Sequence, residues 1–188
     1  TIPNCVYEAL REEILLKYTS RAYDAENKQY ISLKSLESIY ENQLQEEQRT
    51  KTGTYYTPEY IVAYIAQSTL ASYLFKETGT PISLGGGDIE ALQLDKERVI
   101  EVSAAIDKLK LIDIACGGGV FIRGSLGLLF SLKKKLYNLM DITVTDYSIK
   151  KTIIENNLYG IDIQEPTVVL CRILLLMELP VEVYSRNP

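Results

Sequence analysis

The 188-residue chain contains no histidine and only three cysteines. Without histidine, this chain alone cannot build a Ser-His-Asp or Cys-His catalytic relay, and zinc sites that need an imidazole ligand are excluded. Cys5, Cys116 and Cys171 are too few and too scattered for a disulfide framework or a Cys-x-x-Cys metal site. The sequence therefore predicts no metal centre, and the reducing cytoplasm is the expected compartment.

Long hydrophobic runs and an excess of positive charge are missing as well. The most apolar run, 168–179, is short and contains Arg172, so no membrane-spanning segment is predicted. A net charge of −5 argues against a surface that binds phosphates along its whole length. Any contact with nucleic acid is therefore expected to be local or to come from parts outside this chain. The chain begins with Thr1 and not with Met, which favours excision from something longer.

What the chain does contain is enough apolar sequence for a core, with 46% hydrophobic and 24% charged residues. Apolar positions at helical spacing predict two amphipathic helices, over 3–18 and 31–49, within an N-terminal helical segment, 1–50. A loop without apolar periodicity follows. The remainder, 51–188, is predicted to be one incomplete α/β domain.

The first helix of that domain is predicted to begin with Thr57 as N-cap and Pro58 at the first helical position. Ile61, Ile65 and Leu70 would form its apolar face. Turn-forming residues then predict a flexible excursion over 79–87 and a helix over 89–108. The later pattern predicts, in order, a strand over 109–115, helices over 121–139 and 146–156, a strand over 158–163, a helix over 166–178 and a strand at 181–184. This order is typical of a parallel α/β sheet.

The segment with the most chemical information is 113–121, Asp-Ile-Ala-Cys-Gly-Gly-Gly-Val-Phe. A strand that ends in glycines before a helix exposes backbone N–H groups and a helix N-terminus to a ligand. Asp113 adds a negative charge, which would repel a phosphate but attract an ammonium group. The dinucleotide pattern GxGxxG also fails, because it needs glycine where Ile122 stands.

An amino-acid-bearing nucleoside such as S-adenosylmethionine fits this segment better. It offers an ammonium group to the acid and a carboxylate to the backbone donors. Its ribose needs an acidic partner on the next strand, and Asp162 is placed there, with Ile163 available for the adenine face. Both acids are hard to explain as buried structural residues, because a buried carboxylate is costly without a partner.

Three motifs in order resemble those of N6-adenine DNA methyltransferases of restriction-modification and phage-defence systems. The segment 113–121 resembles their cofactor-binding motif, usually Asp-Pro-Ala-Cys-Gly-Ser-Gly-x-Phe. The segment 53–62, Gly-Thr-Tyr-Tyr-Thr-Pro-Glu-Tyr-Ile-Val, is similar to the motif that precedes it. The segment 156–163, Asn-Asn-Leu-Tyr-Gly-Ile-Asp-Ile, resembles the ribose-binding motif. The similarity spans about residues 31–179 and implies a partial Rossmann-like, S-adenosylmethionine-dependent methyltransferase fold after the N-terminal helical segment.

The resemblance also implies roles for single residues. Thr57 would bind the methionine carboxylate and Asp113 the methionine amino group, while Asp162 with Ile163 would hold the adenosine. The residues that would line the cofactor are Ala115, Cys116, Gly117, Gly118 and Gly119. The chain departs from the family pattern at Ile114, at Gly118 and at Gln164-Glu165-Pro166.

The catalytic motif of the family, Asn-Pro-Pro-Tyr or similar, is absent from this chain. Asn187-Pro188 follows Asp162 too closely to serve, so no catalytic residue is assigned. The expectation is a cofactor-binding portion of a site-specific adenine methyltransferase that is inactive alone. Its parent protein would act on double-stranded DNA, with a restriction or specificity subunit as a further partner. An uncovered sheet edge would make the portion self-associating or marginally stable.

Simpler interpretations and other functions remain open at this point. Thr57-Pro58 is also an ordinary helix start, and the lysine runs 133–135 and 150–151 are more often solvated faces than phosphate contacts. Cys116 and Cys171 fit small buried apolar groups. The alternative functions are a degenerate methyltransferase-like module for binding or assembly, and a nucleotide-dependent oxidoreductase with an altered glycine loop.

Overall fold

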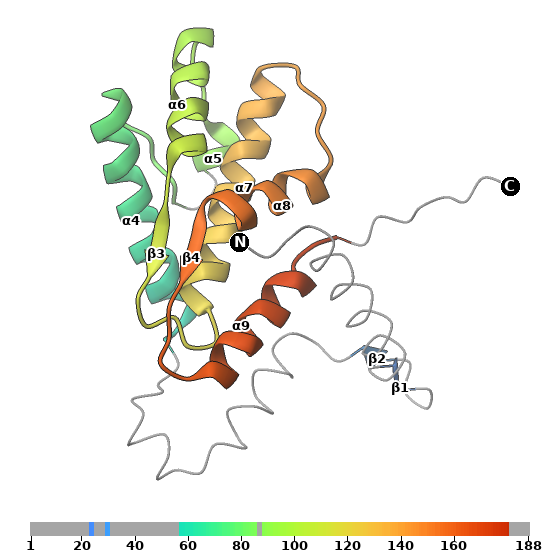
Figure 1. Ribbon diagram of the computed structural model, residues 1–188. Helices are drawn as coiled ribbons and strands as arrows, with labels where there is room; N and C mark the ends of the chain where they lie inside the picture. Colours follow the sequence, from blue (N-terminus) through green and yellow to red (C-terminus); the bar gives the residue numbers. More distant parts are fainter. Residues whose placement is uncertain (1–22, 25–28, 31–56, 86–87, 181–188) are drawn as a thin grey trace, which may run out of the picture.

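The computed structural model describes residues 23–24, 29–30, 57–85 and 88–180 of the chain (Figure 1). Its elements are β1 (Tyr23–Asp24), β2 (Gln29–Tyr30), α4 (Glu59–Thr78), α5 (Asp88–Ala91), α6 (Lys96–Lys108), β3 (Leu111–Asp113), α7 (Val120–Leu139), α8 (Asp146–Asn156), β4 (Leu158–Gly160) and α9 (Glu165–Met177). The predicted helices over 3–18 and 31–49 and the predicted strand at 181–184 lie outside the described residues. The sequence interpretation missed the short antiparallel pair β1 and β2, in which Tyr23 lies opposite Tyr30.

Strands β3 and β4 form a parallel pair, as the order of elements predicted. Leu111 lies opposite Leu158, and Asp113 lies opposite Gly160. Both strands are shorter than predicted, but backbone pairing continues past them, because Ile161 N donates to Asp113 O at 2.8 Å. The result is mixed helix with a small two-stranded parallel sheet, which is compatible with the α/β class.

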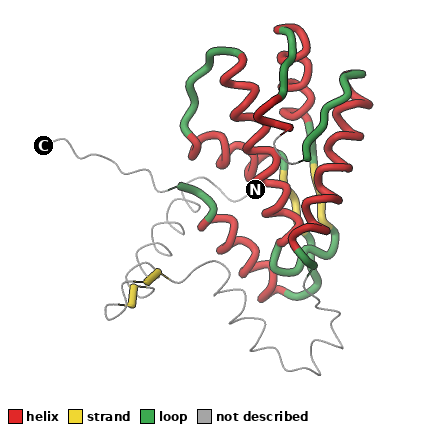
Figure 2. Tube along the Cα trace, turned by 180° about the vertical axis from the view of Figure 1, so that it is seen from behind, coloured by secondary structure: helices red, strands yellow, loops and turns green. Residues whose placement is uncertain are grey.

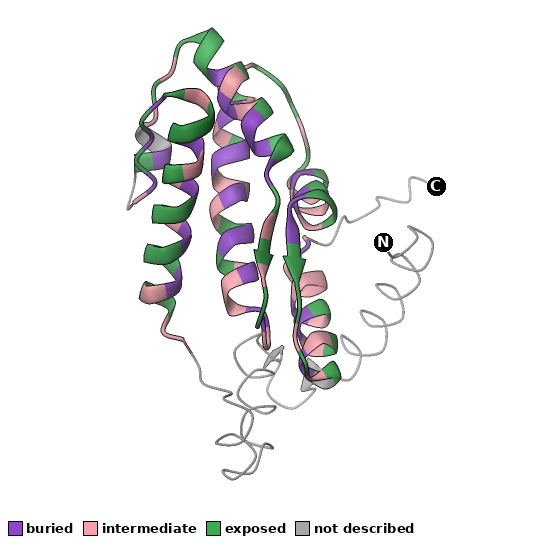
Figure 3. Cartoon of the chain, turned by 60° about the vertical axis from the view of Figure 1, so that its left-hand side comes forward, coloured by how far each residue is buried: buried purple, intermediate pink, exposed green. Residues whose placement is uncertain are grey.

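The two faces of this sheet have different surroundings. Successive side chains of a strand point to opposite faces, so Leu111, Leu158 and Gly160 share one face. Helix α7 packs there, and a Cβ added to Gly160 would lie 2.6 Å from Ile122 Cδ1. The strands lie in front of α7 in Figure 1 and behind the helices in the reverse view of Figure 2. Among the described residues, the other face carries the exposed side chains of Ile112 and Tyr159, and the exposed Ile114 and Ile161 follow the two strands directly. The exposed parts of both strands are green in Figure 3.

Helix α7 supplies the centre of the core. The helix packs against α4, α6 and α8. Its buried apolar residues recur every three or four positions: Ile122, Leu126, Leu129, Leu132 and Leu136. The buried residues of α4 are Val62, Ala66, Leu70 and Leu74. The predicted apolar face of α4 was therefore wrong at Ile65, which is 44% exposed. A face shifted by one residue brings Val62 against Gly124, where an added Cβ would lie 2.6 Å from Val62 Cγ1.

The start of α4 also differs from the prediction. The helix begins at Glu59, and the N-cap is Pro58, with φ of −55° and ψ of 141°, not Thr57. No side-chain hydrogen bond caps this end. The extended ψ of Pro58 keeps it outside the helix, so Thr57 lies one residue before the cap.

The segment after α4 is packed and is not the loose excursion that its glycine, proline and serine content predicted. Thr80, Ile82 and Leu84 are buried, and the residues between them are exposed. The predicted helix over 89–108 is divided into α5 and α6. The break occurs because Asp95 caps α6, its carboxylate accepting a hydrogen bond from Arg98 N at 2.9 Å.

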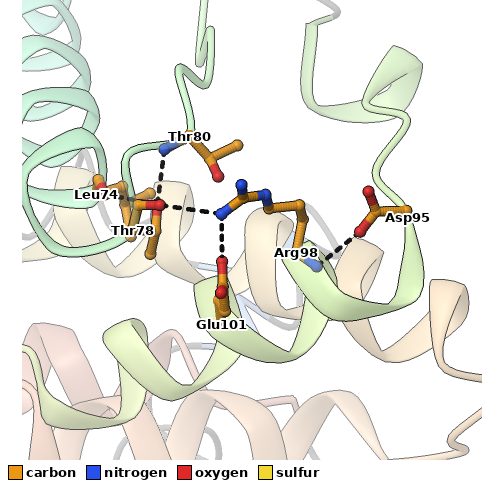
Figure 4. A network of polar contacts seen from close by, with 6 residues as sticks. All are labelled: Leu74, Thr78, Thr80, Asp95, Arg98 and Glu101. Carbon is orange, nitrogen blue, oxygen red and sulfur yellow. Dashed lines mark hydrogen bonds and ion pairs between the residues drawn. The ribbon is translucent and has the colours of Figure 1, made fainter.

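A polar network joins this segment to α6 (Figure 4). Thr78 Oγ1 donates to Leu74 O at 2.8 Å and accepts a hydrogen bond from Thr80 N at 3.1 Å. Arg98 reaches the carbonyl of Thr78 at 3.3 Å and pairs with Glu101 at 2.7 Å. The end of α4 and the start of α6 are thereby held together.

Two buried polar side chains complete the packing. Asn157, just before β4, donates to the carbonyls of Ile106 and Leu109 at 2.8 and 2.9 Å and so joins the end of α6 to the sheet. Lys133 is 2% exposed and pairs with Asp107 at 2.6 Å. The interpretation of the lysine run 133–135 as a solvated face was therefore wrong for Lys133. No helix among the described residues has the length and apolar character needed to cross a membrane.

Candidate cofactor-binding site

The predicted site residues gather where the carboxyl ends of β3 and β4 meet the starts of α7 and α9 (Figure 1). In a parallel sheet the strand ends point to one edge, and the helices that follow begin there. The start of α4 belongs to the same end, because Val62 in its first turn contacts Gly124 in the first turns of α7. Strand ends and helix N-termini therefore surround one region.

The glycine loop between β3 and α7 has a backbone that only glycine adopts without strain. Gly117 has φ of 50° and Gly119 has φ of 84°, both in the left-handed region. Gly119 N donates to Cys116 O at 2.7 Å and closes the turn. A Cβ on Gly119 would lie 2.3 Å from Cys171 Sγ, whereas a Cβ on Gly117 would meet nothing within 4 Å. Gly119 is thus required by packing, and Gly117 leaves its outer side open.

Helix α7 begins at this loop without a side-chain cap. Gly119 is its N-cap and offers no side-chain acceptor, and the first turn contains no acidic residue. The first N–H groups of a helix lack intrahelical partners and carry a partial positive charge. This end of α7 can therefore accept an anionic group such as a ligand carboxylate.

Asp162 is the most extensively hydrogen-bonded carboxylate of the site. Its Oδ2 accepts a hydrogen bond from Gly117 N at 2.8 Å, which links the strand end to the glycine loop. Its Oδ1 accepts hydrogen bonds from Gln164 N at 2.8 Å and from the Thr167 hydroxyl at 3.2 Å. Partial burial acts to raise the pKa of Asp162, but these hydrogen bonds together outweigh it and lower the pKa. The side chain is therefore a fixed, negatively charged acceptor.

Asp113 lies on the same side of the sheet as Asp162. Asp113 is paired with Gly160, and Asp162 stands two residues beyond Gly160, so the alternation of strand side chains directs both acids to one face. Both carboxylates also act on one thiol, since burial raises the pKa of Cys116 and the charges of Asp113 and Asp162 raise it further. Asp113 Oδ1 accepts a hydrogen bond from Ala115 N at 3.1 Å. Two acids thus flank the glycine loop.

Ile163 follows Asp162 and is 98% exposed. No packing role accounts for this apolar side chain, which projects beside a carboxylate that is held in place. Thr57 is half-buried just before α4. The structure places it at the same end of the molecule as the other predicted residues.

Cys116 and Cys171 are buried beneath the loop, as predicted. Their thiols are hydrogen-bonded to each other, and burial raises the pKa of Cys171 to about 12. Neither thiol is therefore a ready nucleophile, because the reactive form is the thiolate. Both are buried side chains that pack against the glycine loop.

In chemical terms the arrangement offers groups that can hold an amino-acid-bearing nucleoside. It combines an uncapped helix N-terminus for a carboxylate, acid at Asp113 for an ammonium group, a fixed acceptor at Asp162 for hydroxyls and an exposed apolar side chain at Ile163 for a base. Among residues 57–85 and 88–180, no group of three or more acidic or cysteine side chains is placed to hold a metal ion. The sequence interpretation missed one residue here, Thr167, which contacts Asp162 from the first turn of α9.

Comparison with known proteins gives one informative similarity. No protein family model matches the chain. No solved structure matches it either. Over 75% of its length, the chain is 31% identical to a protein of Methanocaldococcus jannaschii named "Putative type II restriction enzyme and methyltransferase". The chain spans 13% of the length of that relative, so it is similar to one part of a much longer restriction-modification protein.

Proposed function

We propose that the chain is the S-adenosylmethionine-binding portion of a site-specific DNA adenine-N6 methyltransferase of a restriction-modification system. The observation that carries the proposal is the Asp162 carboxylate, bonded to Gly117 N and followed by the 98% exposed Ile163. A charged acceptor beside an open apolar side chain, at the end of a parallel strand, suits a nucleoside ribose and its base. The restriction enzyme and methyltransferase relative supports the same assignment.

Each residue has a role in this proposal. Asp162 accepts hydrogen bonds from the ribose hydroxyls, and Ile163 covers the adenine. The glycine loop, with Ala115, Cys116 and Gly117–Gly119, lines the cofactor, and the N–H groups at the start of α7 face its carboxylate. Asp113 attracts the ammonium group, and Thr57 contributes to carboxylate binding. When bound, the cofactor supplies an electrophilic methyl group, and this chain's own residues bind and orient it.

Adenine as the target follows from the resemblance of the three motifs to N6-adenine methyltransferases. The chain contains no Asn-Pro-Pro-Tyr-type segment, so the group that accepts the amine protons and the surface that recognises DNA belong to other parts of the whole protein. Base flipping of the target is expected of enzymes that modify a base. Double-stranded DNA and a restriction or specificity subunit are therefore proposed as partners of the whole protein and not of this portion alone.

Calorimetry of the chain with S-adenosylmethionine, S-adenosylhomocysteine and NAD tests the proposal. We expect binding of both methionine-derived ligands and none of NAD. Asp162→Asn and Ile163→Ala should each weaken binding, the latter by about tenfold because an apolar contact with adenine is removed. Ile163→Ala should leave the free energy of unfolding within about 0.5 kcal/mol of the wild-type value, since the side chain is exposed.

A matched control is Ile100→Ala, which truncates another exposed isoleucine, 61% exposed on α6. It should leave the affinity unchanged. Binding of NAD alone would favour the oxidoreductase, and binding of none of the three ligands would favour an assembly module. For the whole protein, digestion of treated DNA should reveal N6-methyladenine, and cofactor binding without DNA methylation would support a degenerate binding module instead.

A further inference from the structure

A hydroxyl group on α9 lies against the carboxylate at the centre of the candidate site. Thr167 is 2% exposed, and its Oγ1 lies 3.2 Å from Asp162 Oδ1 and 2.6 Å from the carbonyl oxygen of Gln164. A threonine hydroxyl has one proton and can donate to only one of these acceptors at a time. Both oxygen atoms lie within hydrogen-bond distance, so rotation of the hydroxyl can direct its proton to either of them.

The backbone N–H groups that donate to Asp162 differ from the Thr167 hydroxyl, because their direction is fixed by the chain. Gln164 N lies 2.8 Å from Oδ1, and Gly117 N lies 2.8 Å from Oδ2. Neither can turn away without moving the chain, whereas a hydroxyl can rotate. When the Thr167 hydroxyl turns from Asp162, the carbonyl of Gln164 still accepts its proton. A ligand hydroxyl can therefore take its place at Oδ1 while Asp162 and Thr167 both stay paired.

We propose that Thr167 is a positioning residue for recognition of a ribose diol. Its hydroxyl supports the Asp162 carboxylate in the empty site and yields that place to a hydroxyl of the bound nucleoside. The proposal rests on the proposed function, because Asp162 is the group assigned to the ribose. To that function it adds a residue outside the three sequence motifs, whose hydroxyl sets how strongly binding depends on the 2′ and 3′ hydroxyls of the ligand.

The test compares the wild-type chain with Thr167→Val and Thr167→Ser. Valine keeps the shape of the side chain without the hydroxyl, and serine keeps the hydroxyl. Calorimetry would measure the affinity for S-adenosylhomocysteine and for its 2′-deoxy and 3′-deoxy analogues. The wild-type chain should bind at least one analogue about tenfold more weakly than the parent ligand, the value of one hydrogen bond to a charged group.

In Thr167→Val, affinity for the parent ligand should change by less than about twofold, because the ligand hydroxyl still binds Oδ1, while affinity for the weaker analogue should fall by about 3–10-fold, because no hydroxyl is then left to pair with Oδ1. The penalty for removing the ligand hydroxyl should therefore grow, and Thr167→Ser should return it to the wild-type value. A matched control is Thr78→Val, which removes another hydroxyl bonded to a backbone carbonyl, 2.8 Å from Leu74 O at the far end of α4. It should leave the penalty unchanged.

Equal weakening of all three ligands, or no change in any, would overturn the role of Thr167. If the valine variant does not fold, Thr167→Ala takes its place. A second readout is independent of the ligand: carbon-13 NMR titration should show a higher pKa for Asp162 in Thr167→Val than in the wild type, and an unchanged pKa would refute the contact. Failure of the wild-type chain to bind any adenosine ligand would instead count against the proposed function, and the titration would still decide the contact.

Discussion

At the scale of single residues, the most direct consequence concerns Thr80. Its Oγ1 is buried and has no hydrogen-bond partner among the described residues. A buried hydroxyl without a partner costs about 1–3 kcal/mol. Thr80→Val, which keeps the shape, should therefore raise the free energy of unfolding by about 1 kcal/mol and the melting temperature by about 2–4 °C. Thermal and urea unfolding would measure both.

The neighbouring Thr78 provides the control for this substitution. Its Oγ1 donates to Leu74 O and accepts a hydrogen bond from Thr80 N, so the same change to valine removes two interactions. Thr78→Val should lower stability by about 1–2 kcal/mol. Loss of stability in both variants would show that the Thr80 hydroxyl is satisfied, contrary to the geometry.

Asp162 gives a prediction about pH. Its hydrogen bonds lower its pKa in the folded chain, so the carboxylate stabilises the fold above its unfolded pKa, near about 3.9. This contribution disappears as the pH falls through the lowered folded value. Asp162→Asn should therefore be less stable than wild type at neutral pH, and the difference should shrink in acid. Urea unfolding between neutral and acidic pH would show it.

A variant of an exposed acid elsewhere controls for the loss of charge. Asp141 has φ of 56°, a conformation that asparagine tolerates well, so Asp141→Asn removes a carboxylate with little strain. A stability difference for Asp162→Asn that stays constant across the pH range would contradict the role of the charged carboxylate. A higher free energy of unfolding for Asp162→Asn than for the wild type would contradict the role of the hydrogen bonds.

At the scale of elements, the glycine loop and α9 are matched in shape. Gly119 combines φ of 84° with a Cβ position only 2.3 Å from Cys171 Sγ. Gly119→Ala should therefore destabilise the chain by about 2–4 kcal/mol through strain and overpacking. Cys171→Ala in the same chain should recover part of this loss, because it removes the sulfur atom. Urea unfolding of the single and double variants would measure the coupling.

Alanine substitutions at the other two glycines of the loop serve as controls for Gly119→Ala. Gly117 has φ of 50° but open space at its Cβ position, so Gly117→Ala should cost about 1 kcal/mol from strain alone. A Cβ on Gly118 would lie 3.6 Å from Leu170, an ordinary contact, so Gly118→Ala should be nearly neutral. Equal effects of alanine at the three positions would show that packing against Cys171 does not control the loop.

The sequence predicted the elements that follow strong local rules. The parallel order of β3 and β4, the glycine loop and helices α7, α8 and α9 were expected within a few residues. The packed segment from Thr80 to Leu84 was missed, because glycine, proline and serine nearby resemble an exposed loop. Lys133 was misplaced because its burial depends on Asp107 from another helix. Thr167 was missed for a similar reason, since a hydroxyl becomes informative only when the fold brings a carboxylate to it.

At the scale of the whole molecule, the proposed chemistry is concentrated at one end, while the core extends along α4, α6, α7 and α8. The glycine loop depends on α9 for packing, and α9 is held in turn at its far end. There Glu178 accepts hydrogen bonds from Arg123 at 3.4 Å and, through its backbone carbonyl, from Lys150 at 2.7 Å. Loss of the contacts at Glu178 should therefore shift α9 and so loosen its packing against the glycine loop.

The sheet face that is exposed among the described residues gives the last prediction. Parallel sheets are normally buried on both faces, yet Ile112 on β3 is 56% exposed, and Ile161, which follows β4 and is still paired with Asp113, is 55% exposed. The chain should therefore bind a fluorescent dye for apolar surfaces and self-associate with rising concentration. Replacing both isoleucines by threonine, which keeps a branched side chain suited to strands, should reduce dye fluorescence and shift sedimentation toward the monomer. The same substitution at Ile100 on α6 should change neither, because that exposed isoleucine lies outside the sheet. Equal effects at both places would mean that general surface polarity, and not the open sheet face, drives the association.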